Sequence, residues 1–447
     1  VTDIGSFSGI ENLTGGTGAD TFNIASGATL TGTIAGGTGT DSITQADGAN
    51  TWDISTANAG DVTDIGSFSG IENLTGGTGV DTFNIASGGT LTGAIAGGTG
   101  TDSLNQANGT NTWDISAANA GDVTDIGSFA SIENLTGGTG ADTFNIASGA
   151  TLTGDIDGGT GTDSIVQADG TNTWGITAAD AGDVTDIGSY SGIENLTGGT
   201  GADTFNIASG ATLTGDIDGG TGTDSLNQAD GTNTWNLSAA NAGDVTDISS
   251  FASIENLTGG TGDDTFNIAS LAGLTGAIAG GTGSDTINQA DDSNTWDITG
   301  ADSGDVTDIG SFSSIENLEG GTGDDTYNIA SGATLTGNID GGTGTNSLNQ
   351  ADGTNTWDIS GTDAGDVTDI GSFSDIQNVT GGTGDDSFNT ARGGSLSGAV
   401  DGGTGTDSLN QADGTNTWNI TGADSGDVTD IGSFSGIENL TGGTGVD

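Results

Sequence analysis

The sequence predicts an all-β protein, a parallel β-solenoid of stacked coils, and three observations predict it. The phrase "VTDIGSF" begins at Val1 and returns, with small edits, every 61 residues. A fixed period of this kind indicates a repeat architecture. Stretches such as "TFNI" and "TWDI" alternate apolar and polar residues, the period of a half-buried strand. Gly, Asn and Asp separate these stretches regularly, as turn residues do.

The repeat leaves no place for separate domains. Seven copies of identical length imply that every residue has a fixed position in a stacked lattice, so we expect one continuous solenoid over residues 1–447. Complete absence of Pro fits strands that must each donate hydrogen bonds to the next coil. The repeats are 1–61, 62–122, 123–183, 184–244, 245–305, 306–366 and 367–427, followed by a partial copy, 428–447.

Each repeat is predicted to contain three coils of about 20 residues. The first coil would consist of a turn at 15–20, a strand at 21–25, a small turn at 26–28 and a strand at 29–34. No apolar 3.6-residue period persists, and glycine recurs every few residues, which excludes helices. The alignment makes Leu13, Ile34, Ile54 and Leu74 equivalent and places Asp20, Asp41 and Asp61 in one column.

The composition excludes several classes of function. The chain has 62 acidic residues and one basic residue, Arg392, giving a net charge of −61. Nothing in it can neutralise the phosphates of a nucleic acid. With no His, Cys or Lys, a nucleophile has no conventional base, so we do not expect an enzyme. No apolar run approaches the roughly 20 residues that cross a membrane.

The repeated glycine turn points to cations. The turn "GGTGAD" at 15–20 places backbone carbonyls and a closing carboxylate about 4.8 Å from the equivalent turn of the next coil. Carboxylates stacked so closely repel one another unless a cation lies between them. Calcium takes six to eight oxygen ligands and therefore suits such a site, whereas magnesium prefers a tighter octahedron.

At these residues the chain resembles a known family. "GGTGADTFN" (15–23) and "GGTGTDSIT" (36–44) are similar to the nonapeptide GGxGxDxUx of RTX-type calcium-binding β-roll repeats. "SFSGIENLTGGTGADTF" resembles the repeat regions of giant type I-secreted bacterial surface proteins and adhesins. The resemblance covers every repeat. It implies a right-handed parallel β-roll or β-helix that folds outside the cell as it binds several Ca²⁺ ions.

The chain departs from that family in ways that bear on the sites. An RTX roll carries calcium along both edges, whereas one nonapeptide per coil predicts ions along a single edge here. We expect the best sites between first and second coils, and a damaged site at Asp325 because residue 346 is Asn. The predicted metal ligands are Asp20, Asp41, Asp81, Asp102, Asp142, Asp163, Asp203, Asp224, Asp264, Asp285, Asp325, Asp386, Asp407 and Asp447. Weaker sites are expected at Asp61, Asp122, Asp183, Asp244, Asp305, Asp366 and Asp427.

Two other interpretations of these turns stay open. The aspartates alone could cap turns by accepting backbone N–H bonds, without any metal. A column of Thr17, Thr38 and Asn58 on the same edge resembles the Thr/Asn arrays of ice-binding calcium-dependent β-rolls. The neighbouring column of Ala19, Thr40 and Gly60 is irregular, which argues against that use.

These features together predict a calcium-stabilised structural repeat region of a secreted bacterial cell-surface protein. It would act as the shaft or spacer of an adhesin, with an extracellular or cell-surface location. Its expected partners are calcium ions and other copies of itself, without nucleic acid or membrane insertion. The main alternative is a self-assembling extracellular filament, surface-layer or matrix protein, and a third is an ice-binding β-roll.

Overall fold

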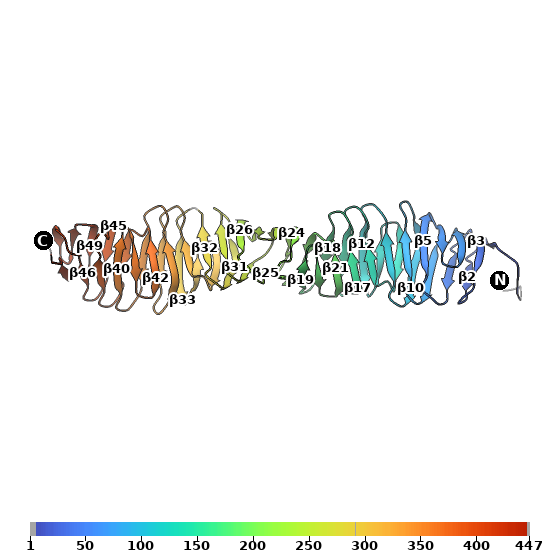
Figure 1. The fold of residues 1–447 in the computed structure, drawn as a ribbon, viewed down its shortest axis with the longest axis horizontal. Helices are drawn as coiled ribbons and strands as arrows, with labels where there is room; N and C mark the ends of the chain where they lie inside the picture. The colour runs from blue at the N-terminus through green and yellow to red at the C-terminus, as the bar shows by residue number, and fades with distance from the viewer. Residues whose placement is uncertain (1–5, 291, 445–447) are drawn as a thin grey trace. The chain divides into compact units, whose positions relative to one another are not determined.

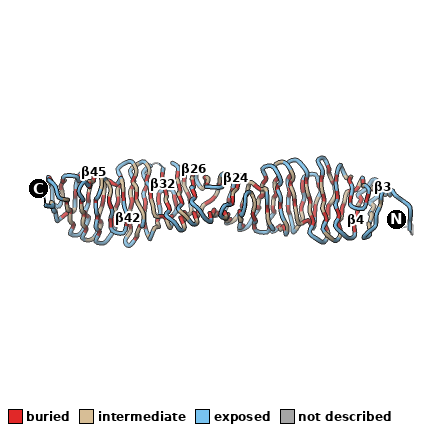
Figure 2. The backbone as a smooth tube through the Cα atoms, viewed as in Figure 1, coloured by how far each residue is buried: buried red, intermediate tan, exposed pale blue. Residues whose placement is uncertain are grey.

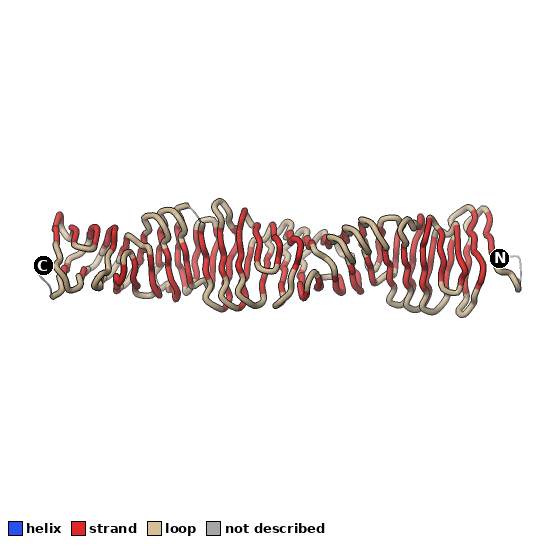
Figure 3. The backbone as a smooth tube through the Cα atoms, turned by 45° about the horizontal axis from the view of Figure 1, so that its top comes forward, coloured by secondary structure: helices blue, strands red, loops and turns tan. Residues whose placement is uncertain are grey.

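The protein is an all-β solenoid of stacked 61-residue repeats, which confirms the predicted fold class (Figure 1). The computed structural model describes residues 6–290 and 292–444. Figure 3 shows strands joined by bends, with no helix among the residues it describes. The chain forms two compact units, residues 1–222 with 247–249 and residues 223–246 with 250–447. Whether one continuous solenoid spans all 447 residues stays a prediction.

The first unit has two sheets, and within each sheet successive strands are hydrogen-bonded neighbours. The first sheet contains β1 (Leu13–Gly16), β3 (Leu30–Gly37), β7 (Ile65–Ser69), β6 (Ala59–Val62), β5 (Thr51–Thr56), β9 (Thr82–Ile85), β11 (Ser103–Gln106), β15 (Asn134–Thr136), β17 (Leu152–Asp157), β21 (Ile187–Ser191), β20 (Ala181–Val184), β19 (Thr173–Ala178) and β23 (Thr204–Ile207). The second sheet contains β2 (Thr21–Ile24), β4 (Ser42–Gln45), β8 (Asn73–Thr78), β10 (Leu91–Thr99), β14 (Ile126–Ala130), β13 (Ala120–Val123), β12 (Thr112–Ala117), β16 (Thr143–Ile146), β18 (Ser164–Gln167), β22 (Asn195–Thr197) and β24 (Leu213–Asp218).

The second unit repeats this arrangement. Its first sheet contains β25 (Ser225–Gln228), β29 (Asn256–Thr261), β31 (Leu274–Thr282), β35 (Ile309–Ser313), β34 (Ser303–Val306), β33 (Thr295–Gly300), β37 (Thr326–Ile329), β39 (Ser347–Gln350), β43 (Asn378–Thr380), β45 (Leu396–Asp401), β49 (Ile431–Ser435), β48 (Ser425–Val428) and β47 (Trp418–Gly422). Its second sheet contains the part of β28 (Ile248–Ala252) that follows Ser249, then β27 (Ala242–Val245), β26 (Thr234–Ala239), β30 (Thr265–Ile268), β32 (Thr286–Gln289), β36 (Asn317–Glu319), β38 (Leu335–Asp340), β42 (Ile370–Ser374), β41 (Ala364–Val367), β40 (Thr356–Gly361), β44 (Ser387–Thr390), β46 (Ser408–Asn410) and β50 (Asn439–Thr441).

The predicted division of each repeat into three coils is wrong. Leu13 does pair with Ile34, as the alignment requires, but Ile34 then pairs with Phe68 and not with Ile54. Ile54 itself lies opposite Ile85, and the predicted alignment had placed it beside Leu74. Residues that pair on neighbouring strands are therefore separated by unequal distances along the sequence, and the third predicted coil does not exist.

A three-stranded antiparallel meander replaces the third coil. Asn58 has φ 49° and Asp64 has φ 69°, and at these two residues the chain reverses between β5 and β6 and again between β6 and β7. Asn and Asp tolerate this left-handed conformation better than other residues with side chains. The single strands β1 to β4 and the meander visit the two sheets alternately, five visits in all. One repeat is therefore two and a half coils long.

The half coil turns each repeat over relative to the one before it. In the first unit, the meander β5–β6–β7 belongs to the first sheet and the next meander, β12–β13–β14, belongs to the second sheet. Two consecutive repeats thus add seven strands to each sheet, which keeps the two sheets matched in size.

The core lies between the sheets. Buried residues alternate with half-buried or exposed ones along most strands, and the bends at the edges are mostly exposed (Figure 2). Trp52, Ile54 and Phe83 are fully buried. The indole of Trp52 stacks on the ring of Phe83, with centroids 5.6 Å apart, and meets Phe68 edge to face at 6.3 Å. The equivalent tryptophans Trp113, Trp174, Trp235, Trp296 and Trp357 are fully buried too, so they are core residues, whereas Trp418 is half-buried.

Candidate functional site

The glycine turns bring aspartates of neighbouring coils together. The backbone N–H of Asp81 donates to Oδ1 of Asp102 at 2.7 Å, 21 residues later. The same bond joins Asp142 to Asp163 at 2.7 Å. Equivalent bonds join Asp20 to Asp41, Asp264 to Asp285 and Asp386 to Asp407. The structure thus places first-coil and second-coil aspartates side by side, as the sequence predicted.

Each aspartate pair belongs to a longer row that sequence reasoning missed. Buried Asn50 donates both its backbone N–H and its side-chain Nδ2 to Oδ1 of Asp81 at 2.8 Å. At the other end, the N–H of Asp102 donates to Oε2 of Glu133 at 2.8 Å. We call such a row of Asn, Asp, Asp and Glu an acid ladder. The regular recurrence of Asn in "TNTW" and of Glu in "IEN" is the sequence signal that could have revealed it.

Complete acid ladders recur through both units. They are Asn50–Asp81–Asp102–Glu133, Asn111–Asp142–Asp163–Glu194, Asn233–Asp264–Asp285–Glu316 and Asn355–Asp386–Asp407–Glu438, with Asn294–Asp325–Asn346–Gln377 as a variant. Shorter stretches are Asp20–Asp41–Glu72, Asn172–Asp203 and Asp224–Glu255. Asp447 lies outside the described residues.

The second carboxylate oxygen of these aspartates has no hydrogen-bond donor. Asp81 and Asp102 are fully buried, and their Oδ2 atoms meet no protein N–H or O–H. A buried charged oxygen without a donor is costly, because it has lost its water and gained nothing in return. The same holds for Oδ2 of Asp20, Asp41, Asp142, Asp163, Asp264, Asp285, Asp325, Asp386 and Asp407.

These oxygens face backbone carbonyls. A Cβ placed on Gly36 would overlap both Oδ2 of Asp41 and the carbonyl oxygen of Gly70. Only glycine leaves room for the two oxygens to approach one another beside its Cα. The first glycine of this turn is therefore required by close approach, and the two polar atoms nearest to the place of its Cβ are both acceptors.

Burial makes these carboxyls reluctant to ionise. It raises the pKa of Asp102, and the negative Asp81 and Glu133 nearby raise it further, although the N–H of Asp81 works in the opposite direction. Burial raises the pKa of Asp285 to about 6. It also raises the pKa of Asp81, Asp142, Asp163, Asp203, Asp264, Asp325, Asp386 and Asp407. A proton or a cation near Oδ2 would relieve this electrostatic cost.

The predicted column of Asp20, Asp41 and Asp61 is wrong. Asp61 lies on β6 in the middle of the meander, opposite Asp53, while the N–H of Asp41 donates to Glu72. The reason is the reversal at Asn58, which carries Asp61 away from the glycine turns. Its counterparts Asp122, Asp183, Asp244, Asp305, Asp366 and Asp427 also lie on the middle strands of meanders, exposed or half-buried.

The expectation that the glycine turns follow a single edge is also wrong. The turn at 36–41 leads from β3 in the first sheet to β4 in the second, whereas the turn at 76–81 leads from β8 in the second sheet to β9 in the first. Successive ladders of the first unit therefore occupy opposite edges. The column of Thr17, Thr38 and Asn58 depended on the same alignment and fails with it, because Ile34 pairs with Phe68 and not with Ile54.

The donor set at each turn suits a hard cation, although no set of three acids surrounds one. Among the described residues, no three acidic side chains converge closely enough to hold a metal ion. What each turn offers is one buried carboxylate oxygen and nearby carbonyl oxygens. Calcium accepts both kinds of ligand and completes its shell with further carbonyls or water. Whether the aspartates bind metal stays a prediction.

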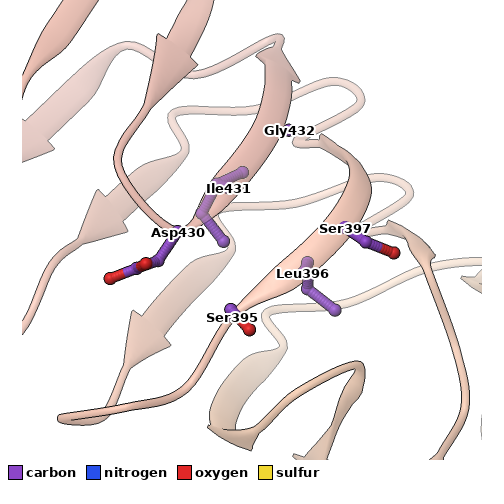
Figure 4. A pocket seen from close by; sticks show the side chains of 6 residues that line it. All are labelled: Ser395, Leu396, Ser397, Asp430, Ile431 and Gly432. Atoms are coloured by element: carbon purple, nitrogen blue, oxygen red, sulfur yellow. The ribbon is translucent and has the colours of Figure 1, made fainter.

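One hollow on the surface, with a volume of about 310 Å³, lies between β45 and β49 and is lined by Ser395, Leu396, Ser397, Asp430, Ile431 and Gly432 (Figure 4). One acid and two hydroxyls do not form a catalytic group. Within the described residues, no helix has the length and apolar character needed to cross a membrane.

Comparisons with known proteins give little further information. No family model matches the chain, and no curated protein matches it. One similar solved structure is the X-ray crystal structure of a hyperactive, Ca²⁺-dependent, β-helical antifreeze protein from an Antarctic bacterium. The identity is 19%, the match covers 91% of this chain and 86% of that chain, and the TM-score is 0.10. So low a TM-score carries no argument about this chain's function.

Proposed function

We propose that this β-helical repeat protein is the calcium-stabilised structural region of a secreted bacterial cell-surface protein, serving as a shaft or spacer. One observation carries the proposal: outside the ladder of Asn294, the complete acid ladders bury aspartate oxygens that face carbonyls and have no donor. A net charge of −61 adds to the need for cations. Each ion would lie beside Oδ2 of a ladder aspartate, with glycine carbonyls as further ligands.

Calcium would then couple folding to location. An ion that binds the folded coil, and not the unfolded chain, stabilises the coil by about 2.7 kcal/mol per site at a concentration 100 times its Kd. Where calcium is scarce, as in a cytosol, the acids repel and the fold is less stable, which favours an unfolded chain during export. Where calcium is plentiful, outside the cell, the chain folds. The regular acid ladders fit a structural role. Their Asn, Asp and Glu residues form no group that we would expect to catalyse a reaction.

The test is the stability of the chelated protein as calcium is added. Far-ultraviolet circular dichroism and thermal melting should show a large gain in β-structure or melting temperature with Ca²⁺. Mg²⁺ should give less, and Na⁺ at equal ionic strength should give only the screening effect. A melting curve that responds equally to all three salts would leave simple screening as the explanation and remove calcium from the proposal.

The rival functions are separated by two further measurements on the calcium-loaded protein. Electron microscopy and sedimentation show single particles for a spacer and long threads or sheets for a filament or surface layer. A cold-stage microscope shows faceted ice crystals only for an ice-binding protein. We expect single particles and unshaped ice.

A further inference from the structure

One acid ladder has lost two charges at neighbouring positions. In the ladder that begins at Asn294, the second aspartate is replaced by Asn346 and the glutamate by Gln377. The two residues are in contact, because the backbone N–H of Asn346 donates to Oε1 of Gln377 at 2.6 Å. The remaining ladders keep both acids. Two touching residues have thus changed in the same chemical sense, from carboxylate to amide, with their shapes preserved.

The side-chain amide of Asn346 makes a hydrogen bond at the place where Oδ2 of the other ladder aspartates has none. Its Oδ1 keeps the ladder bond, accepting the N–H of Asp325 at 2.9 Å. Its Nδ2 donates to the carbonyl oxygen of Asp375 at 2.9 Å, 29 residues later. Gln377 donates its own Nε2 to that carbonyl at 3.2 Å. Fully buried Asn346 therefore has both ends of its side chain satisfied.

The neighbouring ladder has the same geometry without the donor. A Cβ on Gly341 would meet Nδ2 of Asn346 and the carbonyl oxygen of Asp375. In the ladder of Asp285, a Cβ on Gly280 would likewise meet Oδ2 of Asp285 and the carbonyl oxygen of Ser314. Nδ2 and Oδ2 thus occupy equivalent places, each beside the carbonyl of the residue 29 positions on.

Two facing oxygens attract only when something positive lies between them. We infer that Asn346 and Gln377 make a turn that holds without any cation, and that in the other ladders the cation binds between Oδ2 of the second aspartate and the carbonyl oxygen 29 residues later. The inference rests on the proposed role of calcium. The amide hydrogen stands in for the ion, and Gln377 removes the second charge that the ion would have balanced.

This turn gives the second unit one segment that is indifferent to calcium. When calcium is removed, the coils around Asn346 keep their hydrogen bonds while the coils around Asp285 lose the ion that joins their oxygens. Loss of structure on chelation then begins in the acid ladders and reaches the amide turn last. The predicted damage at Asp325 becomes, on this inference, an exchange of an ion for a hydrogen bond.

Two reciprocal double variants test the inference in the full chain. Asn346→Asp with Gln377→Glu restores the acids, and Asp285→Asn with Glu316→Gln copies the amide turn one repeat earlier. Asp375→Ser is the control for local charge, because Ser131 and Ser314 occupy that position in other repeats. Calorimetric titration counts the Ca²⁺ ions bound, and thermal melting in chelator reports calcium-free stability.

The expected results are opposite for the two double variants. The restored acids should add one bound Ca²⁺ and lower the melting temperature in chelator by at least about 2 °C, whereas the copied amides should remove one ion and raise it by a similar amount. Asp375→Ser should leave the number of bound Ca²⁺ ions unchanged. Unchanged counts for both double variants, or amides at 285 and 316 that destabilise the chelated protein, would overturn the inference. If calcium binds neither the parent chain nor any variant, the proposed function fails and the ion site between Oδ2 and the carbonyl fails with it, while opposite melting shifts in chelator would still support the amide turn.

Discussion

Trp113 and Phe144 lie stacked in the core, 31 residues apart in sequence, with ring centroids 5.5 Å apart and planes at 15°. Phe129 meets the same indole edge to face at 6.3 Å. Because Trp113 is fully buried between the sheets, Trp113→Ala should cost about 3–5 kcal/mol of unfolding free energy. Denaturant titration measures the loss.

The control for this substitution is Thr112→Ala, next to Trp113 but exposed. A surface change of this kind should stay within about 0.5 kcal/mol of the parent chain. Equal losses of unfolding free energy at the two positions would show that the ring contacts of Trp113 with Phe129 and Phe144 do not stabilise the stacking of neighbouring coils.

Acid should stabilise the chelated protein. Asp285 has a pKa of about 6 in the folded chain and an ordinary value of 3.8, so between these values the folded state binds more protons than the unfolded state. Its contribution to stability is therefore fully present below 3.8 and is lost as the pH rises through about 6. Asp102 and Asp163 shift in the same direction. Melting temperatures in chelator should rise from about pH 7 to about pH 5.

General relief of charge repulsion would also favour acid, so a matched pair of variants separates the two causes. Asp285→Asn removes a buried ladder carboxyl and should flatten the pH dependence. Asp366→Asn removes an exposed acid of a meander and should leave the dependence almost as it was. If both variants flatten it equally, the buried carboxyls are not its source.

Glu133 should matter for stability although it closes no glycine turn. Its Oε2 accepts the N–H of Asp102 at 2.8 Å and its Oε1 accepts Nδ2 of Asn119 at 2.9 Å. Glu133→Ala leaves the N–H of Asp102 without its acceptor and leaves Nδ2 of Asn119 with Oγ1 of Thr153 alone, so it should cost about 1–3 kcal/mol in denaturant titration. Glu133→Gln keeps an oxygen for Asp102, as Gln377 does for Asn346, and should cost less. A glutamine variant as unstable as the alanine variant would contradict this account.

The sequence predicted what depends on local pattern. The alternating strands and the contact of Asp20 with Asp41 follow from signals within about 20 residues, and the 61-residue period follows from direct repetition of the sequence. The meander did not follow, because its reversals depend on Asn58 and Asp64 adopting positive φ, and the same residues also suit ordinary turns. Glu72 was missed for a related reason. It lies 31 residues beyond Asp41, a spacing that an assumed coil of about 20 residues conceals.

Leu271 is expected to weaken the turn in which it stands. It is 91% exposed and has φ 65°, a conformation that costs a residue with a side chain about 1–2 kcal/mol. Gly210 and Gly332 hold the equivalent position in other repeats, with φ 75° and 77° and no atom near the place of a Cβ. Leu271→Gly should therefore raise the unfolding free energy, by about 1 kcal/mol after the entropy that glycine loses on folding.

The reverse change, Gly332→Leu, places the same side chain in an equivalent turn of the same unit and should lower stability by a similar amount. The two variants differ in sign only if backbone strain decides the effect, because the exposed leucine makes no packing contacts to gain or lose. Thermal melting in saturating calcium compares them without interference from ion loss. If both variants melt at the temperature of the parent chain, backbone strain at this position does not affect stability, and the prediction is wrong.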